Sequence, residues 1–172
     1  SQLVAALALR SVDVMVVTGA LGSVGHAAVF TAKATGAHVW AAVRAAQQKA
    51  VEMLGIEGVV PLDAEIGSAP TFDAIADTVG AGPVQQLLDQ VRAGGRLASV
   101  VSEPPDAKER GLIVQHVWAH PDHERLAVML RAVADGLLVI PIAKRFSLSQ
   151  IREAHESAQR GAGGKVIVRI GA

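Results

Sequence analysis

One short stretch near the start of the chain, residues 14–25, constrains the fold more than any other. It reads VMVVTGALGSVG, an apolar and largely β-branched run that leads directly into closely spaced glycines. Such a run is typical of a central strand that is buried on both faces of a sheet. A helical pattern begins within a few residues, so the stretch predicts a strand, a glycine-rich turn and a helix.

The glycines of this turn have the spacing G-x-x-G-x-x-G, with Ala20 where a dinucleotide-binding turn more often has its first glycine. We expect Gly19 and Ala20 to allow a tight turn. Gly22 would let the backbone approach a pyrophosphate, and Gly25 would let the helix pack closely on the strand.

The start of the following helix is a candidate anion site. The backbone N–H groups of Gly22, Ser23 and Val24 would face the phosphates, together with the positive end of the helix dipole. A glycine-rich turn can also serve packing alone. The sequence therefore favours a pyrophosphate site, with a purely structural turn as the alternative.

The composition excludes several classes of protein. The 172 residues suffice for one well-buried α/β domain and are short for two. Lys and Arg total 16, as do Asp and Glu, so no charge excess indicates a nucleic-acid or membrane-surface partner. No apolar segment approaches the ~20 residues of a membrane span, and no signal-peptide pattern opens the chain. We expect a cytoplasmic setting.

The sequence contains no cysteine and no tyrosine, and each absence excludes a class of site or enzyme. The chain has no cysteine, which excludes disulfides, thiol nucleophiles and thiolate-bound zinc within it. It also has no tyrosine. Short-chain dehydrogenases begin with a similar Thr-Gly turn but use a tyrosine in a Tyr-x-x-x-Lys motif as proton donor. That family is therefore excluded, and Ser23 also stands where its second glycine would fall.

Apolar periodicity, caps and glycines give a coarse secondary structure. Helices are predicted over residues 1–11, 23–35, 45–54, 84–92, 122–134 and 147–159. Strands are predicted over residues 14–17, 38–43, 58–60, 72–79, 96–101, 112–117 and 165–170, with loops over 61–71 and 102–111. The β-α-β-α-β order with short connections favours a parallel sheet with right-handed crossovers.

Four stretches resemble the cofactor domain of medium-chain dehydrogenase/reductases. They read VMVVTGALGSVGHAAV, FDAIADTVG, AGGRLASVVSEPP and FSLSQIREAHESAQRGAGGKVIV, and they occur in the family's order. Within the superfamily they are most similar to the zinc-independent NADPH:quinone-reductase-like enzymes. The resemblance implies a doubly wound parallel sheet (a Rossmann fold) of three α/β/α layers, with strand order 3-2-1-4-5-6, as one NAD(P)-binding domain over residues 1–172.

The end of the second predicted strand indicates which cofactor is bound. Arg44 stands there, 19 residues after Gly25. An acidic residue at this place would bond the ribose 2′-hydroxyl of NAD, whereas a basic one accommodates the 2′-phosphate of NADP. Lys49 would assist Arg44. The sequence therefore predicts NADP(H), with a solvated surface arginine as the alternative.

The resemblance adds residues at two further strand ends. Thr78 and Gly80 would lie along the cofactor towards the nicotinamide. Backbone groups from Val100 to Ser102 would meet the nicotinamide carboxamide. Asp77 is a conceivable general base, but a residue of this type at a strand end more often caps the turn. We assign no catalytic acid within the chain.

The histidines do not predict a metal site. His116, His120 and His123 have spacings that suit one helix, but His116 falls in a predicted strand and Pro121 separates the other two. No acidic ligand has an obvious place beside them. We therefore predict no metal.

The resemblance implies an NADPH-binding domain of an oxidoreductase that transfers a hydride to a quinone or an α,β-unsaturated carbonyl. A non-catalytic NADP(H)-binding module is the alternative. A methyltransferase that binds S-adenosylmethionine is disfavoured, because it would place an acid where Arg44 stands.

The family's N-terminal catalytic domain is not found in this sequence, and residues 147–172 would pack on it. We therefore expect the chain alone to be weak or inactive as an enzyme. The predicted edge strand, Leu112–Val117, carries no proline and no charged Lys, Arg, Asp or Glu. Such an edge offers unpaired backbone groups. We expect a homodimer through this strand, as in the resembled superfamily.

Overall fold

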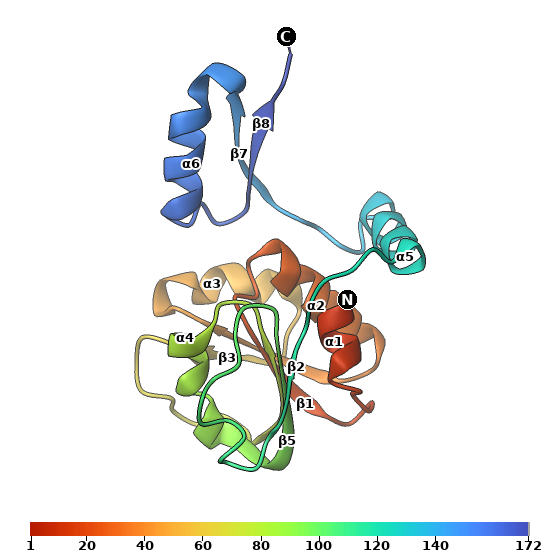
Figure 1. Cartoon of the computed structure of the whole chain (residues 1–172), viewed down its shortest axis with the longest axis vertical. Helices are drawn as coiled ribbons and strands as arrows, with labels where there is room; N and C mark the ends of the chain where they lie inside the picture. The colour runs from red at the N-terminus through yellow and green to blue at the C-terminus, as the bar shows by residue number, and fades with distance from the viewer. Residues whose placement is uncertain (172) are drawn as a thin grey trace.

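A six-stranded parallel sheet forms the centre of the computed structural model, which describes residues 1–171 (Figure 1). The strand order is β3-β2-β1-β4-β5-β6, as predicted. The strands are β1 (Val14–Thr18), β2 (His38–Val43), β3 (Gly58–Pro61), β4 (Phe72–Asp77), β5 (Val91–Ser99) and β6 (Ile113–His116). The switch in strand order lies between β1 and β4, whose carboxyl ends are where such sheets bind ligands.

Both faces of the sheet are covered, which explains why residues 14–17 of β1 are all apolar. Met15 and Val17 belong to one core and Val16 to the other, and all three are fully buried. The first core is covered by α1 (Gln2–Ala6), α2 (Ser23–Ala34) and α3 (Gln48–Val51). The second is covered by α4 (Ala81–Gln85), η3 (Leu88–Gln90) and residues 102–112. The short helices η1 (Ala45–Gln47) and η2 (Glu52–Leu54) flank α3.

Several predicted boundaries are wrong. The predicted strands over residues 96–101 and 112–117 are β5 (Val91–Ser99) and β6 (Ile113–His116), and the predicted helix over residues 45–54 is divided into η1, α3 and η2. The first helix ends at Ala6 and does not reach residue 11. The predicted helix over residues 84–92 is replaced by α4, η3 and the start of β5, because Val91 pairs with Phe72 across the sheet. The fourth strand ends at Asp77 rather than residue 79, because the Asp77 carboxylate accepts the next backbone N–H groups and turns the chain.

A small unit at the C-terminal end contains a strand that the sequence did not predict. β7 (Ile142–Ser147) pairs in parallel with β8 (Lys165–Arg169) in a separate two-stranded sheet. η4 (Leu148–Gln150) and α6 (Ile151–Gln159) connect them. Figure 1 shows this unit apart from the central sheet. Ser147 and Gln150 form a capping box at the start of η4, since the Ser147 N–H donates to Gln150 Oε1 at 3.1 Å.

Helix α5 (His123–Ala134) follows β6 and begins where the sequence predicted, with Asp122 as its cap. Its apolar side chains are largely exposed, with only Ala132 buried. None of the helices in residues 1–171 combines the length and apolar character that crossing a membrane requires.

Candidate functional site

The glycine turn, residues 19–25, joins β1 to α2 at the switch in strand order. Gly19 has φ +64°, and a Cβ added there would lie 2.4 Å from Thr78 Oγ1. A Cβ at Gly25 would lie 2.2 Å from the carbonyl oxygen of Gly19. Both positions therefore require glycine, the first for its backbone conformation and the second for close packing of α2. Ala20 is fully buried beneath the turn, so its methyl group serves packing.

The backbone donors of the turn differ in part from the prediction. The N–H of Gly22 donates to the carbonyl oxygen of Gly19 at 2.9 Å and is not free for a phosphate. Within residues 1–171, the N–H groups of Ser23, Val24 and Gly25 have no hydrogen-bond partner. The first turn of α2 carries neither an acidic residue nor a side-chain cap. Three unpaired donors and the helix dipole therefore leave an anion-binding end.

The predicted cations beyond β2 are both on the surface. Arg44 follows β2 directly and Lys49 lies on α3, and both side chains are exposed. In the described part of the chain neither forms an ion pair. The guanidinium of Arg44 points towards the C-terminal unit, because a Cβ at Gly161 would lie 3.8 Å from its Nη2. Next to Arg44, the N–H of Ala45 donates to Asp63 Oδ1 at 2.7 Å.

A buried polar cluster holds the carboxyl ends of β1, β4 and β5 together. Asp77 is fully buried and accepts hydrogen bonds from Thr18 Oγ1 and Ser99 Oγ, both at 2.6 Å. Its Oδ1 also accepts the N–H groups of Val79 and Gly80 at 3.1 Å. The prediction that Asp77 caps this turn is confirmed.

The other predicted strand-end residues lie around this cluster. Thr78 Oγ1 donates to the carbonyl oxygen of Thr18 at 2.7 Å, which ties β4 to the glycine turn. Gly80 is buried with φ +105°, and a Cβ there would lie 3.0 Å from Val101 Cγ1. The N–H groups of Val100 and Ser102 donate to the Asp77 carbonyl and to Ser99 Oγ. The structure therefore brings these two loops into contact.

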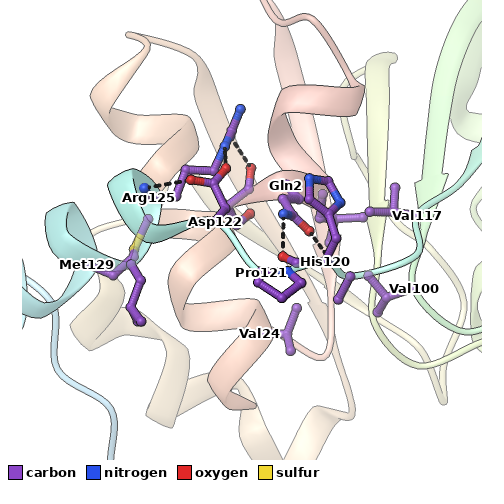
Figure 2. A pocket seen from close by; sticks show the side chains of 13 residues that line it. Gln2, Val24, Val100, Val117, His120, Pro121, Asp122, Arg125 and Met129 are labelled. Atoms are coloured by element: carbon purple, nitrogen blue, oxygen red, sulfur yellow. Dashed lines mark hydrogen bonds and ion pairs between the residues drawn. The ribbon is translucent and has the colours of Figure 1, made fainter.

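An apolar cavity of about 440 Å³ opens beside the glycine turn (Figure 2). Val24 of α2, Val100 after β5 and Val117 after β6 reach it from three elements. Its further apolar lining comes from Leu3, Ala119, Pro121, Leu126 and Met129. The cavity has the size of an ordinary small-molecule site. Two of its residues, Val24 and Val100, are among those predicted to bind the cofactor.

Polar contacts fix the rim of the apolar cavity. The Gln2 side chain donates to the carbonyl oxygen of His120 at 2.9 Å and accepts its N–H at 3.2 Å, which fastens the segment after β6 to α1. Asp122 accepts the N–H of Arg125 at 2.9 Å and pairs with its guanidinium at 2.7 Å. The backbone N–H and the charge of Arg125 lower the pKa of Asp122.

A second cavity, here called the glycine cavity, borders residues 21–23 of the turn and has a volume of about 360 Å³. One wall consists of residues 21–23 with Gln47, and the other of Ala158 and residues 161–166. Lys165 is the single cation in this lining. Residues 161–165 are not among the predicted site residues, although three glycines followed by a lysine are a recognisable anion-binding composition.

The described residues do not fit a metal centre. Among residues 1–171 there is no group of three or more His, Asp or Glu side chains that could hold a metal ion. The His116 ring instead packs against Trp118, with ring centroids 4.6 Å apart. His26 Nδ1 lies 3.0 Å from the carbonyl oxygen of Gly22, so this buried histidine packs on the glycine turn.

Comparison with solved structures finds the same fold in several proteins. The quinone oxidoreductase from Coxiella burnetii superposes with a TM-score of 0.88 at 24% identity, covering 99% of this chain and 56% of that chain. A probable oxidoreductase from Mycobacterium abscessus matches with a TM-score of 0.73 at 27% identity, covering 95% and 56% of the two chains. CurA from Vibrio vulnificus, solved in complex with NADPH, matches with a TM-score of 0.78 at 16% identity, covering 99% and 60%.

The present chain therefore spans little more than half the length of these proteins. A search of curated proteins gave no match. The family model described as zinc-binding dehydrogenase matches residues 61–168, which is more than half of the chain. With the strand order and the glycine turn, this match confirms the resemblance to the cofactor domain of medium-chain dehydrogenase/reductases: the chain belongs to the zinc-binding dehydrogenase family.

Proposed function

We propose that this chain binds NADP(H) across the glycine turn as the cofactor domain of an oxidoreductase. The observation that carries the proposal is the position of the α2 N-terminus between two cavities. Val24 lines the apolar cavity, whereas Gly22 and Ser23 line the glycine cavity. A dinucleotide has a pyrophosphate between two different ends, and the three unpaired N–H groups lie where that pyrophosphate would sit.

The two cavities suit the two ends of the cofactor. The apolar cavity would receive the nicotinamide ring, with Val24, Val100 and Val117 against its faces. The glycine cavity would receive the phosphates, with Lys165 as a counter-charge. Residues 147–172, which contribute Lys165, would also pack on a substrate-binding domain.

The side chains after β2 support NADP(H) rather than NAD(H). Arg44 and Lys49 are exposed and available to a phosphate, and an arginine binds a phosphate with two parallel hydrogen bonds. The nearby carboxylate of Asp63 accepts the N–H of Ala45 through Oδ1. Thr78, Gly80, Val100 and Ser102 would border the nicotinamide half.

When bound, the cofactor supplies the hydride, and the protein supplies orientation and electrostatics. We propose a quinone or an α,β-unsaturated carbonyl as the acceptor class. The quinone oxidoreductase among the structures that share this fold supports this choice. The chain's own residues bind the phosphates, hold the ring against apolar side chains and keep water from it.

The catalytic part of the proposal is tested by NADPH oxidation. The purified chain is mixed with NADPH and either a small quinone or an α,β-unsaturated ketone, and the loss of NADPH absorbance is followed. Turnover with either acceptor supports an enzyme. Binding of NADPH without turnover of either acceptor favours the non-catalytic module, or a chain that needs its substrate domain.

A further inference from the structure

The buried carboxylate of Asp77 is hydrogen-bonded directly to the loop after β4 and, through Ser99, to the loop after β5. We propose that Asp77 is a positioning residue for the nicotinamide half of the cofactor. This inference rests on the proposed function and assigns a role to a charged group that the proposed chemistry leaves unused. Asp77 has none of its surface exposed to solvent, so it acts through its neighbours rather than on a substrate.

One carboxylate oxygen fixes the loop after β4. Asp77 Oδ1 accepts the N–H groups of Val79 and Gly80, each at 3.1 Å. It also accepts the Thr18 hydroxyl at 2.6 Å, and Thr18 Oγ1 in turn accepts the N–H of Thr78 at 2.9 Å. This oxygen therefore sets the path of residues 78–80 against the end of β1.

The other oxygen fixes the loop after β5 through a serine. Ser99 Oγ donates to Asp77 Oδ2 at 2.6 Å. The same Oγ accepts the N–H groups of Val101 and Ser102, each at 3.1 Å. The carboxylate thus orients the hydroxyl so that both of its lone pairs face the backbone of the second loop.

These two loops border the place proposed for the nicotinamide. Val100 lines the apolar cavity, and the loops touch where Gly80 approaches Val101. A site that binds a ring between rigid loops gains affinity because less ordering remains to be done on binding. The adenosine end lies elsewhere, beside Arg44 after β2, and no hydrogen bond joins Arg44 to this cluster in residues 1–171.

An isosteric amide would break half of this arrangement. In Asp77→Asn, the oxygen can still accept from Thr18 and the two backbone N–H groups, but the NH₂ group faces Ser99 Oγ. That oxygen already accepts two N–H groups, and its own hydrogen would lose its acceptor. The second loop would therefore be released while the first is kept.

The experiment compares two ligands by calorimetry on the whole chain: NADPH, and adenosine 2′,5′-bisphosphate, which lacks the nicotinamide half. In Asp77→Asn the affinity for NADPH should fall on the order of tenfold, the size expected for a lost charged hydrogen bond, whereas the affinity for the bisphosphate stays within about twofold. Ser99→Ala, which leaves the carboxylate in place, should show the same selective loss and serves if Asp77→Asn does not fold.

Asp73→Asn is the matched control. Asp73 lies on the same strand at its other end, where it accepts Arg92 Nε at 2.6 Å and the N–H of Val14 at 2.8 Å. It should lower stability without changing the ratio of the two affinities. The inference is overturned if the Asp77 and Ser99 variants weaken both ligands equally, or neither. An unmodified chain that binds neither ligand would instead overturn the proposed function on which it rests.

Discussion

Gly25 approaches the carbonyl oxygen of Gly19 so closely that a Cβ added to Gly25 would lie 2.2 Å from it. The contact sets α2 directly on the end of β1, and the N–H groups of Ser23 and Val24 at this end of α2 are unpaired. The atoms that this Cβ would meet are the carbonyl oxygen of Gly19 and the backbone of Ala20, and backbone atoms cannot move away as the tip of a side chain could. The position of the proposed phosphate site therefore depends on residue 25 being a glycine.

The first prediction is that Gly25→Ala destabilises the fold. The added methyl group must push α2 from β1, at a cost of about 1–3 kcal/mol in the free energy of unfolding. Urea denaturation followed by circular dichroism measures this change. Gly67→Ala is the control, because a Cβ there meets nothing within 4 Å. Equal stability of the two variants would show that α2 does not pack as described.

A second prediction concerns the choice between NADPH and NADH. The unmodified chain should bind NADPH more tightly, and Arg44→Asp should reduce or reverse the preference by roughly 1–3 kcal/mol, because a charged hydrogen bond is replaced by repulsion. Calorimetry with both cofactors checks it. Arg131→Asp, an exposed charge reversal on α5, should leave the preference unchanged. Equal affinities of the unmodified chain for NADPH and NADH would rule out a preference set by Arg44.

Much of the fold was predictable because it is encoded in local patterns. The apolar run of β1 and the glycines after it gave the strand–turn–helix unit, and short connections gave the parallel order. β7 was missed because its side chains are mostly exposed and carry Lys144 and Arg145, so it lacks the apolar signal of a buried strand. The boundary error at Val91 arose because pairing with Phe72 overrides a weak helical pattern.

Only the parts of the candidate site that come from one short segment, such as the glycine turn, could be predicted from the sequence. Gly161 follows Ser23 by 138 residues, and no periodicity links the two sides of the glycine cavity. The bond from the Gly22 N–H to Gly19 depends on turn geometry that the glycine spacing alone does not specify. Asp77 was correctly expected to cap its turn, but its link to Ser99 requires β4 and β5 to be neighbours.

The third prediction concerns acid stability and Asp13, which is almost completely buried at the amino end of the sheet. Burial raises its pKa, but hydrogen bonds from the Arg10 backbone and side chain and the charges of Arg10 and Arg96 outweigh burial, so the pKa of Asp13 is lowered overall. A lowered folded-state pKa contributes stability above the unfolded value, about 3.9, and loses it as pH falls through the folded value.

Asp13→Asn should therefore be less stable than the unmodified chain at pH 7, by about 1.5–3 kcal/mol, since bonds to a charged group are lost. The difference should shrink as the pH is lowered below about 4. Urea denaturation across this pH range measures it, with the exposed Asp135→Asn as control. If the stability difference between Asp13→Asn and the unmodified chain stayed constant down to acid pH, the ion pairs of Asp13 with Arg10 and Arg96 would not stabilise the fold as described.

The fourth prediction is a homodimer through the edge strand β6. Ile113 is 64% exposed on this edge and Trp118 beyond it is 81% exposed, and an unprotected edge strand is a template for pairing. Sedimentation should show a dimer at micromolar concentration and a monomer for Ile113→Lys. Met53→Lys, on η2 near the opposite edge, should remain dimeric. A monomeric unmodified chain would be inconsistent with pairing through β6.

The central claim, a pyrophosphate bound at the glycine turn, is tested most directly by the calorimetric dissociation constant of NADPH for Gly22→Val. Gly22 lines the glycine cavity, and a branched side chain there would occupy the space of the phosphates while its Cβ meets only the Gly19 carbonyl, at 3.3 Å. We predict that Gly22→Val keeps the circular dichroism spectrum and loses NADPH binding, whereas Gly67→Val binds like the unmodified chain. Affinity of a folded Gly22→Val within about twofold of the unmodified chain would contradict the claim.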